Sequence, residues 1–188
     1  MKPAVLVQAE IIDIGTIRLH GDLGLPREAK GVVLFAHGSG SGRLSPRNRF
    51  VAQTLQKRGL ATLLLDLLEE QEADDRRKVF DIDLLADRLL GATAWLRQQP
   101  ATKELPVGYF GASTGAGAAL QAAARMPKAV AAVVSRGGRP DLAAPWLARV
   151  AAPTLLIVGG DDGPVIEMNQ DALAQLTCQK KLIIVPGA

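Results

Sequence analysis

Residues 107–120 read VGYFGASTGAGAAL. The stretch begins with Val107-Gly-Tyr-Phe110, a short run that is typical of a buried strand. It continues into an alanine-rich segment, 116–126, which stops before Pro127 and predicts a helix. A strand that passes directly into a helix is the repeating unit of a parallel sheet covered by helices, so the stretch predicts an α/β fold.

The same alternation continues on both sides. Apolar runs predict further strands at residues 31–36, 60–67, 130–134, 154–158 and 181–185. Helices are expected at 47–58, 80–99, 142–150 and 166–176, with Phe50 and Leu55 on the apolar face of the first. The runs 5–12 and 16–23 predict a hairpin. We therefore expect a doubly wound, mostly parallel sheet with an antiparallel N-terminal edge hairpin.

The composition is that of a globular protein without a strongly charged surface. The 188 residues include 22 Lys and Arg against 19 Asp and Glu, and only 4% are aromatic. A nucleic-acid-binding protein would cluster its basic residues and interleave aromatic ones. The single cysteine excludes an intramolecular disulfide, and no stretch resembles a signal peptide or a transmembrane helix. We expect one cytoplasmic domain over residues 1–188 that acts on a small molecule, with no nucleic-acid or membrane partner.

The junction between the expected strand and helix carries the strongest chemical signal. Gly111-Ala-Ser113-Thr-Gly115 places a serine midway between two glycines. On a very tight strand-to-helix turn, side chains at the two flanking positions would collide, so both must be glycine. The turn lifts the serine hydroxyl above the carboxyl edge of the sheet, where the N-terminus of the helix favours developing negative charge. The pattern predicts Ser113 as a nucleophile.

A glycine-rich loop after the strand at 31–36 is the second signal, and it reads His37-Gly-Ser-Gly-Ser-Gly42. Acyl transfer needs two backbone N–H donors aimed at the oxyanion. One comes from the residue after the nucleophile and the other from a loop after an earlier strand. Thr114 and Ser39 are therefore the expected oxyanion-hole residues.

An acidic turn, Gly159-Gly-Asp-Asp-Gly-Pro-Val165, follows the expected strand at 154–158. A carboxylate here would project from the same edge of the sheet as Ser113, and the order serine, acid, histidine is that of α/β hydrolases. Asp162 is the expected acid. Asp161 is the alternative, because the stretch is also good turn chemistry.

Together these motifs resemble the serine-nucleophile branch of the dienelactone hydrolase-like α/β hydrolases. The matching stretches are collinear and span the chain; they are residues 34–41, 45–49, 108–115, 135–141 and 156–160. The resemblance implies an α/β-hydrolase fold and hydrolysis of carboxylic esters or lactones through an acyl-enzyme, without a cofactor. In that family the acid lies in an Asp-x-x-Val turn, which Asp162-Gly-Pro-Val165 fits and Asp161 does not.

The sequence departs from the family pattern at two points. Dienelactone hydrolases proper use a cysteine nucleophile, whereas Ser113 stands in that place and Cys178 is expected on a distant helix. The family's catalytic histidine should follow the last strand, beyond Ala188. His37 belongs to the expected oxyanion loop and His20 to the hairpin, so neither takes that place in the chain order.

We therefore expect the 188 residues to be a fragment, or the ordered part, of a longer protein that supplies the histidine. The last expected strand, 181–185, also has no following helix to cover it. If the chain truly ended at residue 188, it would instead be a ligand-binding module with an α/β-hydrolase fold and no turnover.

The remaining signals concern ligands. Arg136 follows a strand at the carboxyl edge, where open α/β sheets bind ligands, and its planar donor fork would suit a carboxylate. Arg47, Arg49 and Arg139 lie in comparable places, and for all four a salt bridge or a solvated surface is the simpler interpretation. No His, Cys or Asp cluster has the spacing of metal ligands, so no metal is expected.

The glycines at 111, 115 and 117 also match the pattern of short-chain dehydrogenases, which bind a dinucleotide. That loop should follow the first strand of the fold. The Tyr-x-x-x-Lys pair of such enzymes is also missing, because Ser113 stands four residues after Tyr109, the only tyrosine. The sequence therefore favours a hydrolase over a dehydrogenase.

Overall fold

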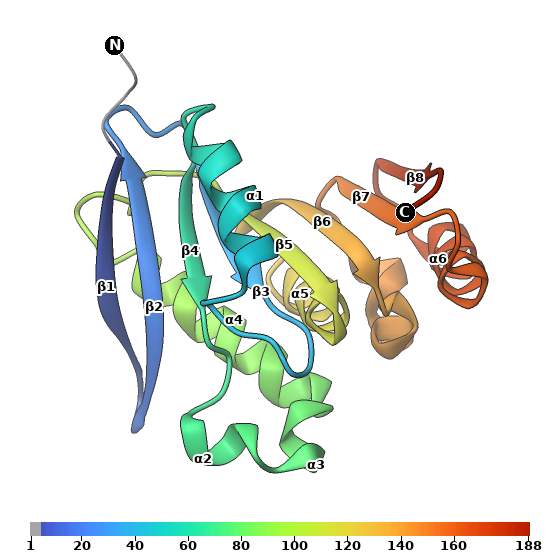
Figure 1. Ribbon diagram of the computed structural model, residues 1–188, viewed down its shortest axis with the longest axis horizontal. Coiled ribbons are helices and arrows are strands. Elements are labelled where there is room, and N and C mark those ends of the chain that lie inside the picture. The colour runs from blue at the N-terminus through green and yellow to red at the C-terminus, as the bar shows by residue number, and fades with distance from the viewer. Residues whose placement is uncertain (1–4) are drawn as a thin grey trace.

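An eight-stranded sheet forms the middle layer of the protein in the computed structural model, which describes residues 5–188 (Figure 1). The strands are β1 (Val5–Ile14), β2 (Ile17–Pro26), β3 (Val32–Ala36), β4 (Ala61–Leu65), β5 (Val107–Ser113), β6 (Val130–Gly138), β7 (Thr154–Gly159) and β8 (Lys180–Val185). Their order is β1-β2-β4-β3-β5-β6-β7-β8. The six strands β3 to β8 are parallel, and the β1–β2 hairpin adds the antiparallel edge. This confirms the α/β-hydrolase architecture expected from the sequence.

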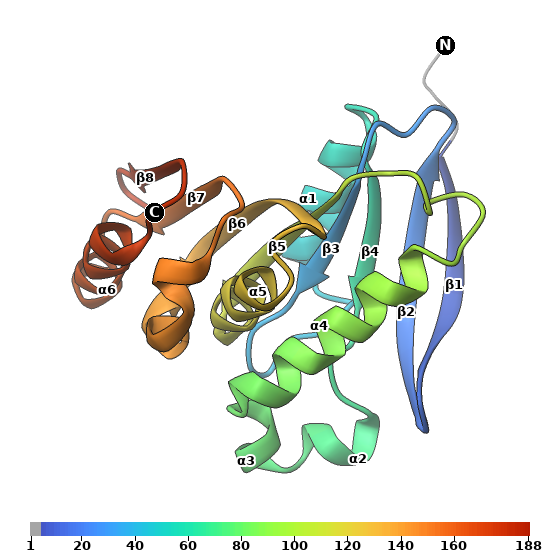
Figure 2. The same cartoon turned by 180° about the vertical axis from the view of Figure 1, so that it is seen from behind.

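Helices cover both faces of the sheet. They are α1 (Pro46–Gln56), α2 (Glu70–Ala73), α3 (Arg76–Val79), α4 (Ile82–Leu96), α5 (Thr114–Arg125), the 3₁₀ segment η1 (Pro140–Arg149) and α6 (Gly163–Gln175). α1 lies in front of the sheet in Figure 1, whereas α4 and α5 lie in front of it in Figure 2. The larger apolar core lies between the sheet and α4 and α5. A smaller core of Phe35, Ala52, Leu64 and Phe110 lies under α1.

α5 is buried on every side. Its residues from Thr114 to Ala124 are all buried, and most of them are alanine or glycine. Small side chains allow close packing: a methyl group added at Gly117 would lie 3.0 Å from the carbonyl oxygen of Arg139. A helix that is apolar all round belongs in the interior, so the helix that follows Ser113 is anchored in the centre of the molecule.

The register of the parallel strands brings several loops to one edge of the sheet. Ala36 of β3 pairs with Gly111 of β5, and Gly111 pairs with Ser135 of β6. The segments that follow these residues therefore meet at the carboxyl edge, where open α/β sheets bind ligands.

The structure differs from the sequence-based expectation in four elements. α2 and α3 were not expected, because they are single turns without an apolar period. The helix expected at 142–150 is the 3₁₀ segment η1, which contains Pro145. In α1, Phe50 is 71% exposed, whereas the polar Asn48 and Gln56 are buried. Gln56 satisfies its amide by donating to Thr62 Oγ1 at 2.7 Å, so the buried face of α1 is partly polar.

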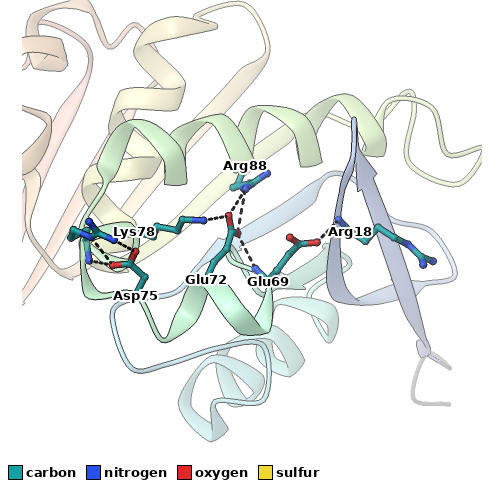
Figure 3. A network of polar contacts seen from close by, with 7 residues as sticks. Arg18, Glu69, Glu72, Asp75, Lys78 and Arg88 are labelled. Atoms are coloured by element: carbon teal, nitrogen blue, oxygen red, sulfur yellow. Dashed lines mark hydrogen bonds and ion pairs between the residues drawn. The ribbon is translucent and has the colours of Figure 1, made fainter.

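Ion pairs connect α2 and α3 to α4 (Figure 3). The Glu72 carboxylate accepts hydrogen bonds from Lys78 Nζ at 3.0 Å and from Arg88 Nη2 at 3.0 Å. The side chains of Glu72 and Arg88 are only 11% and 9% exposed. Burial alone would raise the pKa of Glu72, but the hydrogen bonds from Lys78 and from the Glu69 N–H, with the charges of Arg88 and Lys78, hold that pKa below its ordinary value. We call Glu72, Lys78 and Arg88 the clasp.

Candidate active site

Ser113 lies where β5 passes into α5 without an intervening residue. Its backbone has φ 51° and ψ −126°, and within residues 5–188 no other residue except glycine has a positive φ. The flanking glycines make room for the turn. A methyl group at Gly111 would lie 2.5 Å from Ala116 Cα, and one at Gly115 would overlap the carbonyl oxygen of Ala36. The tight turn predicted from the spacing is present, and the nucleophilic role of the hydroxyl stays a prediction.

The loop after β3 packs against Ser113. A methyl group at Gly38 would lie 2.7 Å from Ser113 Cβ, so no larger residue fits there. In the next residue, the Ser39 N–H donates to the Thr114 hydroxyl at 3.1 Å. The structure therefore brings together the three residues that the sequence assigned to the nucleophile and the oxyanion hole. An incoming oxyanion would share or replace the Thr114 hydroxyl as the acceptor of the Ser39 N–H.

His37 connects this loop to the loop after β4. Its Nε2 accepts the Leu67 N–H at 3.0 Å, so Nδ1 carries the proton and donates to the Gly38 carbonyl at 2.9 Å. Both ring nitrogens are thus occupied. His20 is exposed on β2, and both histidines line a different cavity from that of Ser113.

Asp161 and Asp162 follow β7, and both are exposed. Asp162 immediately precedes α6, and its N–H donates to the Gly159 carbonyl at 3.3 Å. In the part of the chain that the structure describes, neither carboxylate lines the cavity of Ser113. The structure therefore brings neither acid into contact with Ser113, and the assignment of Asp162 rather than Asp161 as the acid stays a prediction.

Ser113 lines a cavity of about 520 Å³ at the carboxyl edge, which we call the serine cavity. Ile157, Val158 and Val185 give it an apolar wall from β7 and β8. Its polar wall consists of Ser45, Arg47, Asn48 and Arg136. No Asp or Glu side chain lines it among the described residues. The volume suits a small molecule, and the charged side chains of its wall are all positive.

Two contacts hold Arg136 in this wall. Its Nη2 donates to Asn48 Oδ1 at 3.3 Å, and its guanidinium carbon lies 5.8 Å from the centroid of the Phe110 ring. Asn48 is 3% exposed, and no sequence pattern singled it out. Burial, and then the positive charge of Arg47, lower the pKa of Arg136. Arg136 therefore lies in the cavity of Ser113, where the sequence predicted it.

The other arginines at this edge are neutralised by carboxylates. The pairs are Arg43 with Asp66 and Asp22, Arg49 with Asp22 at 3.4 Å, and Arg139 with Asp141 at 2.7 Å. A salt bridge is therefore the correct interpretation for Arg49 and Arg139. Within residues 5–188, neither Arg47 nor Arg136 has a side-chain carboxylate within 4 Å.

A second cavity, of about 550 Å³, also borders the loop after β3 and shares Gly38, Ser39 and Ser41 with the serine cavity. Its walls contain the Arg43–Asp66 pair, together with Leu68, Val79 and Leu85 from the region of α2 to α4. The sequence did not predict this cavity, because it depends on α2 and α3.

Three further observations lie outside the two cavities. Cys178 is in the turn between α6 and β8 rather than on a helix, because α6 ends at Gln175, and its thiol donates to Thr154 Oγ1 at 3.7 Å. Among residues 5–188, no three His, Cys, Asp or Glu side chains are grouped as metal ligands. In the same range, no helix is both long enough and apolar enough to cross a bilayer.

The sequence and the fold are similar to those of known proteins. The family model described as the dienelactone hydrolase family matches residues 19–185. The crystal structure of a dienelactone hydrolase from Anabaena variabilis is 59% identical and has a TM-score of 0.95, and the match covers 100% of this chain and 88% of that one. Est1E from Butyrivibrio proteoclasticus has a TM-score of 0.81 at 17% identity, covering 95% and 88% of the two chains, which is a likeness of fold alone.

A curated relative from Mycobacterium tuberculosis is 58% identical over 174 residues and is provisionally named a phosphoribosyl transferase. The match covers 93% of this chain and 39% of the relative, so the chain spans about two fifths of the length of that relative. The family match includes the turn at Ser113, the loop after β3 and the acidic turn after β7. The chain therefore belongs to the dienelactone hydrolase family.

Proposed function

We propose that this protein hydrolyses carboxylic esters or lactones through an acyl-enzyme formed on Ser113. The observation that carries the proposal is the backbone of Ser113, held at φ 51° at the wall of the serine cavity. Strained conformations of this kind persist only where the surrounding structure holds them, and they cluster at functional sites. Membership of a hydrolase family supports the same chemistry.

In the proposed reaction, Ser113 Oγ attacks the carbonyl carbon while its proton passes to a histidine base. The Thr114 and Ser39 N–H groups stabilise the oxyanion, an effect of about 3–4 kcal/mol for each donor. The bond from carbon to the leaving oxygen then breaks, and the base returns its proton to the alcohol. Water, deprotonated by the same base, cleaves the acyl-enzyme, releases the acid and restores the Ser113 hydroxyl.

We propose that the base comes from outside the 188 residues, after β8 in chain order, and that Asp162 orients it. The two hydrogen bonds of His37 make it unsuitable as a base, and His20 lines the other cavity. The exposed Asp162 carboxylate is available to accept the Nδ1–H of a histidine, which fixes the tautomer and stabilises the imidazolium.

Two other functions have less support. Phosphoribosyl transfer is the provisional name of relatives of which this chain matches only 39%. We propose that such an activity belongs to the remaining part of those proteins. A ligand-binding module without turnover would have the same fold, and the following experiment separates it from a hydrolase.

A fluorophosphonate probe tests the nucleophile in the full-length protein. We expect the probe to label Ser113. We expect Ser113→Ala to lose the label and to lower kcat for a p-nitrophenyl ester by about 10⁴-fold or more. Ser41→Ala is the matched control, because Ser41 lines the same cavity and should leave the labelling of Ser113 in place. Labelling that survives Ser113→Ala would overturn the proposal, and an unlabelled wild type would favour the binding module.

A further inference from the structure

We infer that the serine cavity binds a substrate that carries a dianionic group, a phosphate monoester or an unesterified phosphonate, between Arg47 and Arg136. This inference rests on the proposed function, because it names the substrate class of the same site. It is carried by the charges of the cavity wall and by the contacts that orient them.

The serine cavity contains two positive charges that the fold does not neutralise. Arg47 comes from α1 and Arg136 from β6, and both line the cavity that contains Ser113. In the described part of the chain, neither has a side-chain carboxylate within 4 Å, and no Asp or Glu lines the cavity. Arg49, two residues after Arg47 on the same helix, is paired with Asp22. Of these two arginines on α1, the one that lines the cavity is therefore the one without a carboxylate partner.

This arrangement is unfavourable without a ligand. Arg136 is half-buried, and burial and the neighbouring charge of Arg47 both disfavour its charged form. Two like charges at one wall repel each other. An anion bound between them removes the repulsion and replaces the lost hydration of Arg136. Perturbed ionisable groups in a cavity are typical of functional sites.

Arg136 is also oriented in advance. Asn48 accepts one of its N–H groups at 3.3 Å, and the ring of Phe110 lies 5.8 Å from the guanidinium carbon. A guanidinium has five N–H donors in a fixed fork, so several remain for two oxygens of one ligand. Arg47 is exposed and lies in the first turn of α1, near the positive end of that helix. One wall thus combines an oriented guanidinium, Arg136, with an exposed one, Arg47.

The number of charges decides the class of ligand. A carboxylate would balance one arginine and leave the other unpaired. A phosphate monoester carries about −1.5 to −2 charges at neutral pH and has three strong acceptor oxygens, enough for both guanidinium groups. The apolar wall formed by Ile157, Val158 and Val185 would contact the carbon part of the same substrate. The structure thus favours a phosphorylated ester over a carboxylate-bearing one.

The first experiment measures binding without turnover. In full-length protein carrying Ser113→Ala, calorimetric titration at constant ionic strength compares inorganic phosphate with acetate. We expect phosphate to bind at least about tenfold more tightly than acetate. Arg47→Gln and Arg136→Gln should each weaken phosphate binding by about 10- to 100-fold, as expected for a hydrogen bond to a charged group. Arg49→Gln is the matched control and should not weaken it.

The second experiment measures selectivity in protein with Ser113 intact. It compares kcat/KM for p-nitrophenyl butanoate, which is neutral, p-nitrophenyl succinate, which has one charge, and p-nitrophenyl 3-phosphonopropanoate, which has about two. We expect the phosphonate to be preferred over the neutral ester. Either Arg47→Gln or Arg136→Gln should lower that preference by about tenfold or more, and Arg49→Gln should preserve it.

The possible outcomes are distinct. Equal binding of acetate and phosphate would overturn the dianion assignment. Phosphate binding without any preference for the phosphonate ester would identify a site for the free anion and overturn the substrate assignment. If Arg49→Gln weakened phosphate binding as much as Arg47→Gln and Arg136→Gln do, the binding would reflect the net positive charge of the protein. That result would overturn the proposed site between Arg47 and Arg136. Phosphate binding in a protein that cleaves none of the esters would refute the proposed hydrolysis and leave the anion site standing.

Discussion

The two cavities beside the loop after β3 use the same residue types in opposite ways. In the second cavity, Arg43 is paired with Asp66, so its charge is neutralised within the fold. In the serine cavity, Arg47 and Arg136 have no carboxylate partner among the described residues. Arg43 and Arg47 belong to one short segment of the chain. Arg43 is therefore bound within the fold, whereas the charges of Arg47 and Arg136 remain available to the ligand proposed above.

The clasp extends this contrast toward α4. Glu72 lies between Arg88 and Lys78, and its charge is compensated within the protein (Figure 3). Substitutions in the clasp should therefore change the free energy of unfolding and leave the chemistry of the folded protein intact. Substitutions near Ser113 should do the reverse. The predictions for Asp162 and Glu72 below test this division.

The largest expected effect is at Asp162. Asp162→Asn should lower kcat for p-nitrophenyl acetate by about 10⁴-fold, because an asparagine cannot hold the catalytic histidine in the required tautomer. The urea midpoint should not change, since the carboxylate is exposed. Asp161→Asn is the matched control and should have a much smaller effect on kcat. The opposite ranking of the two variants would mean that Asp161 is the acid.

The next effect is at Glu72. Glu72→Gln leaves the buried Arg88 without its counter-charge, which should lower the free energy of unfolding by about 3–5 kcal/mol, measured by urea denaturation at neutral pH. The kcat of the folded fraction should stay the same. Arg77→Gln is the control, because Arg77 is 92% exposed in its pair with Asp75 and solvent screens such a pair, so its loss should hardly change the free energy of unfolding. Equal costs for the two variants would show that burial does not strengthen the Glu72–Arg88 pair, and a lowered kcat in Glu72→Gln would contradict the division between regions.

The same variant has an expected pH dependence. The pKa of Glu72 is held below its ordinary value of 4.5, so its contribution to stability is present above that pH. The contribution is lost as the pH falls through the lower pKa of the folded state. The difference in stability between the wild type and Glu72→Gln should therefore shrink in acid.

The smallest effect at neutral pH is at Tyr109, on the strand that carries Ser113. Burial raises the pKa of Tyr109 to about 12, although its hydroxyl lies 2.7 Å from Thr93 Oγ1. The contribution of the neutral phenol is intact below its ordinary pKa of 10 and is lost as the pH rises toward 12. Tyr109→Phe should cost about 1 kcal/mol at neutral pH and reduce the loss of stability in this alkaline range. Unfolding curves of the two proteins that fall in parallel between these pH values would show that Tyr109 does not titrate with unfolding.

The sequence predicted the parts of the site that depend on the local backbone. The turn at Ser113 needs glycine two residues before and two residues after the serine, and this pattern is visible in five consecutive residues of the sequence. The pairing of the arginines could not be predicted, because the partners are distant in sequence. Arg49 is 27 residues from Asp22, and Arg136 is 88 residues from Asn48.

Apolar periodicity also did not predict the elements in which charged and polar contacts replace apolar ones. Ion pairs and capping hydrogen bonds stabilise α2 and α3, so no apolar periodicity in the sequence predicts these two helices. In α1, the buried Asn48 accepts a hydrogen bond from Arg136, while the apolar Phe50 is exposed to solvent. The cavities depend on these elements, and their walls could therefore be described only from the structure.

The burial of α5 from Thr114 to Ala124 has a consequence for motion. Amide protons of such a helix exchange with solvent through openings that approach global unfolding, whereas those of exposed loops exchange through local ones. The backbone behind Ser113 should therefore be among the slowest-exchanging parts of the protein. Ser39, Gly40 and Ser41 on the facing loop are exposed and should exchange quickly. Adjustment of the site to ligands of different shape would then come from the loop after β3, with Ser113 as the stationary reference.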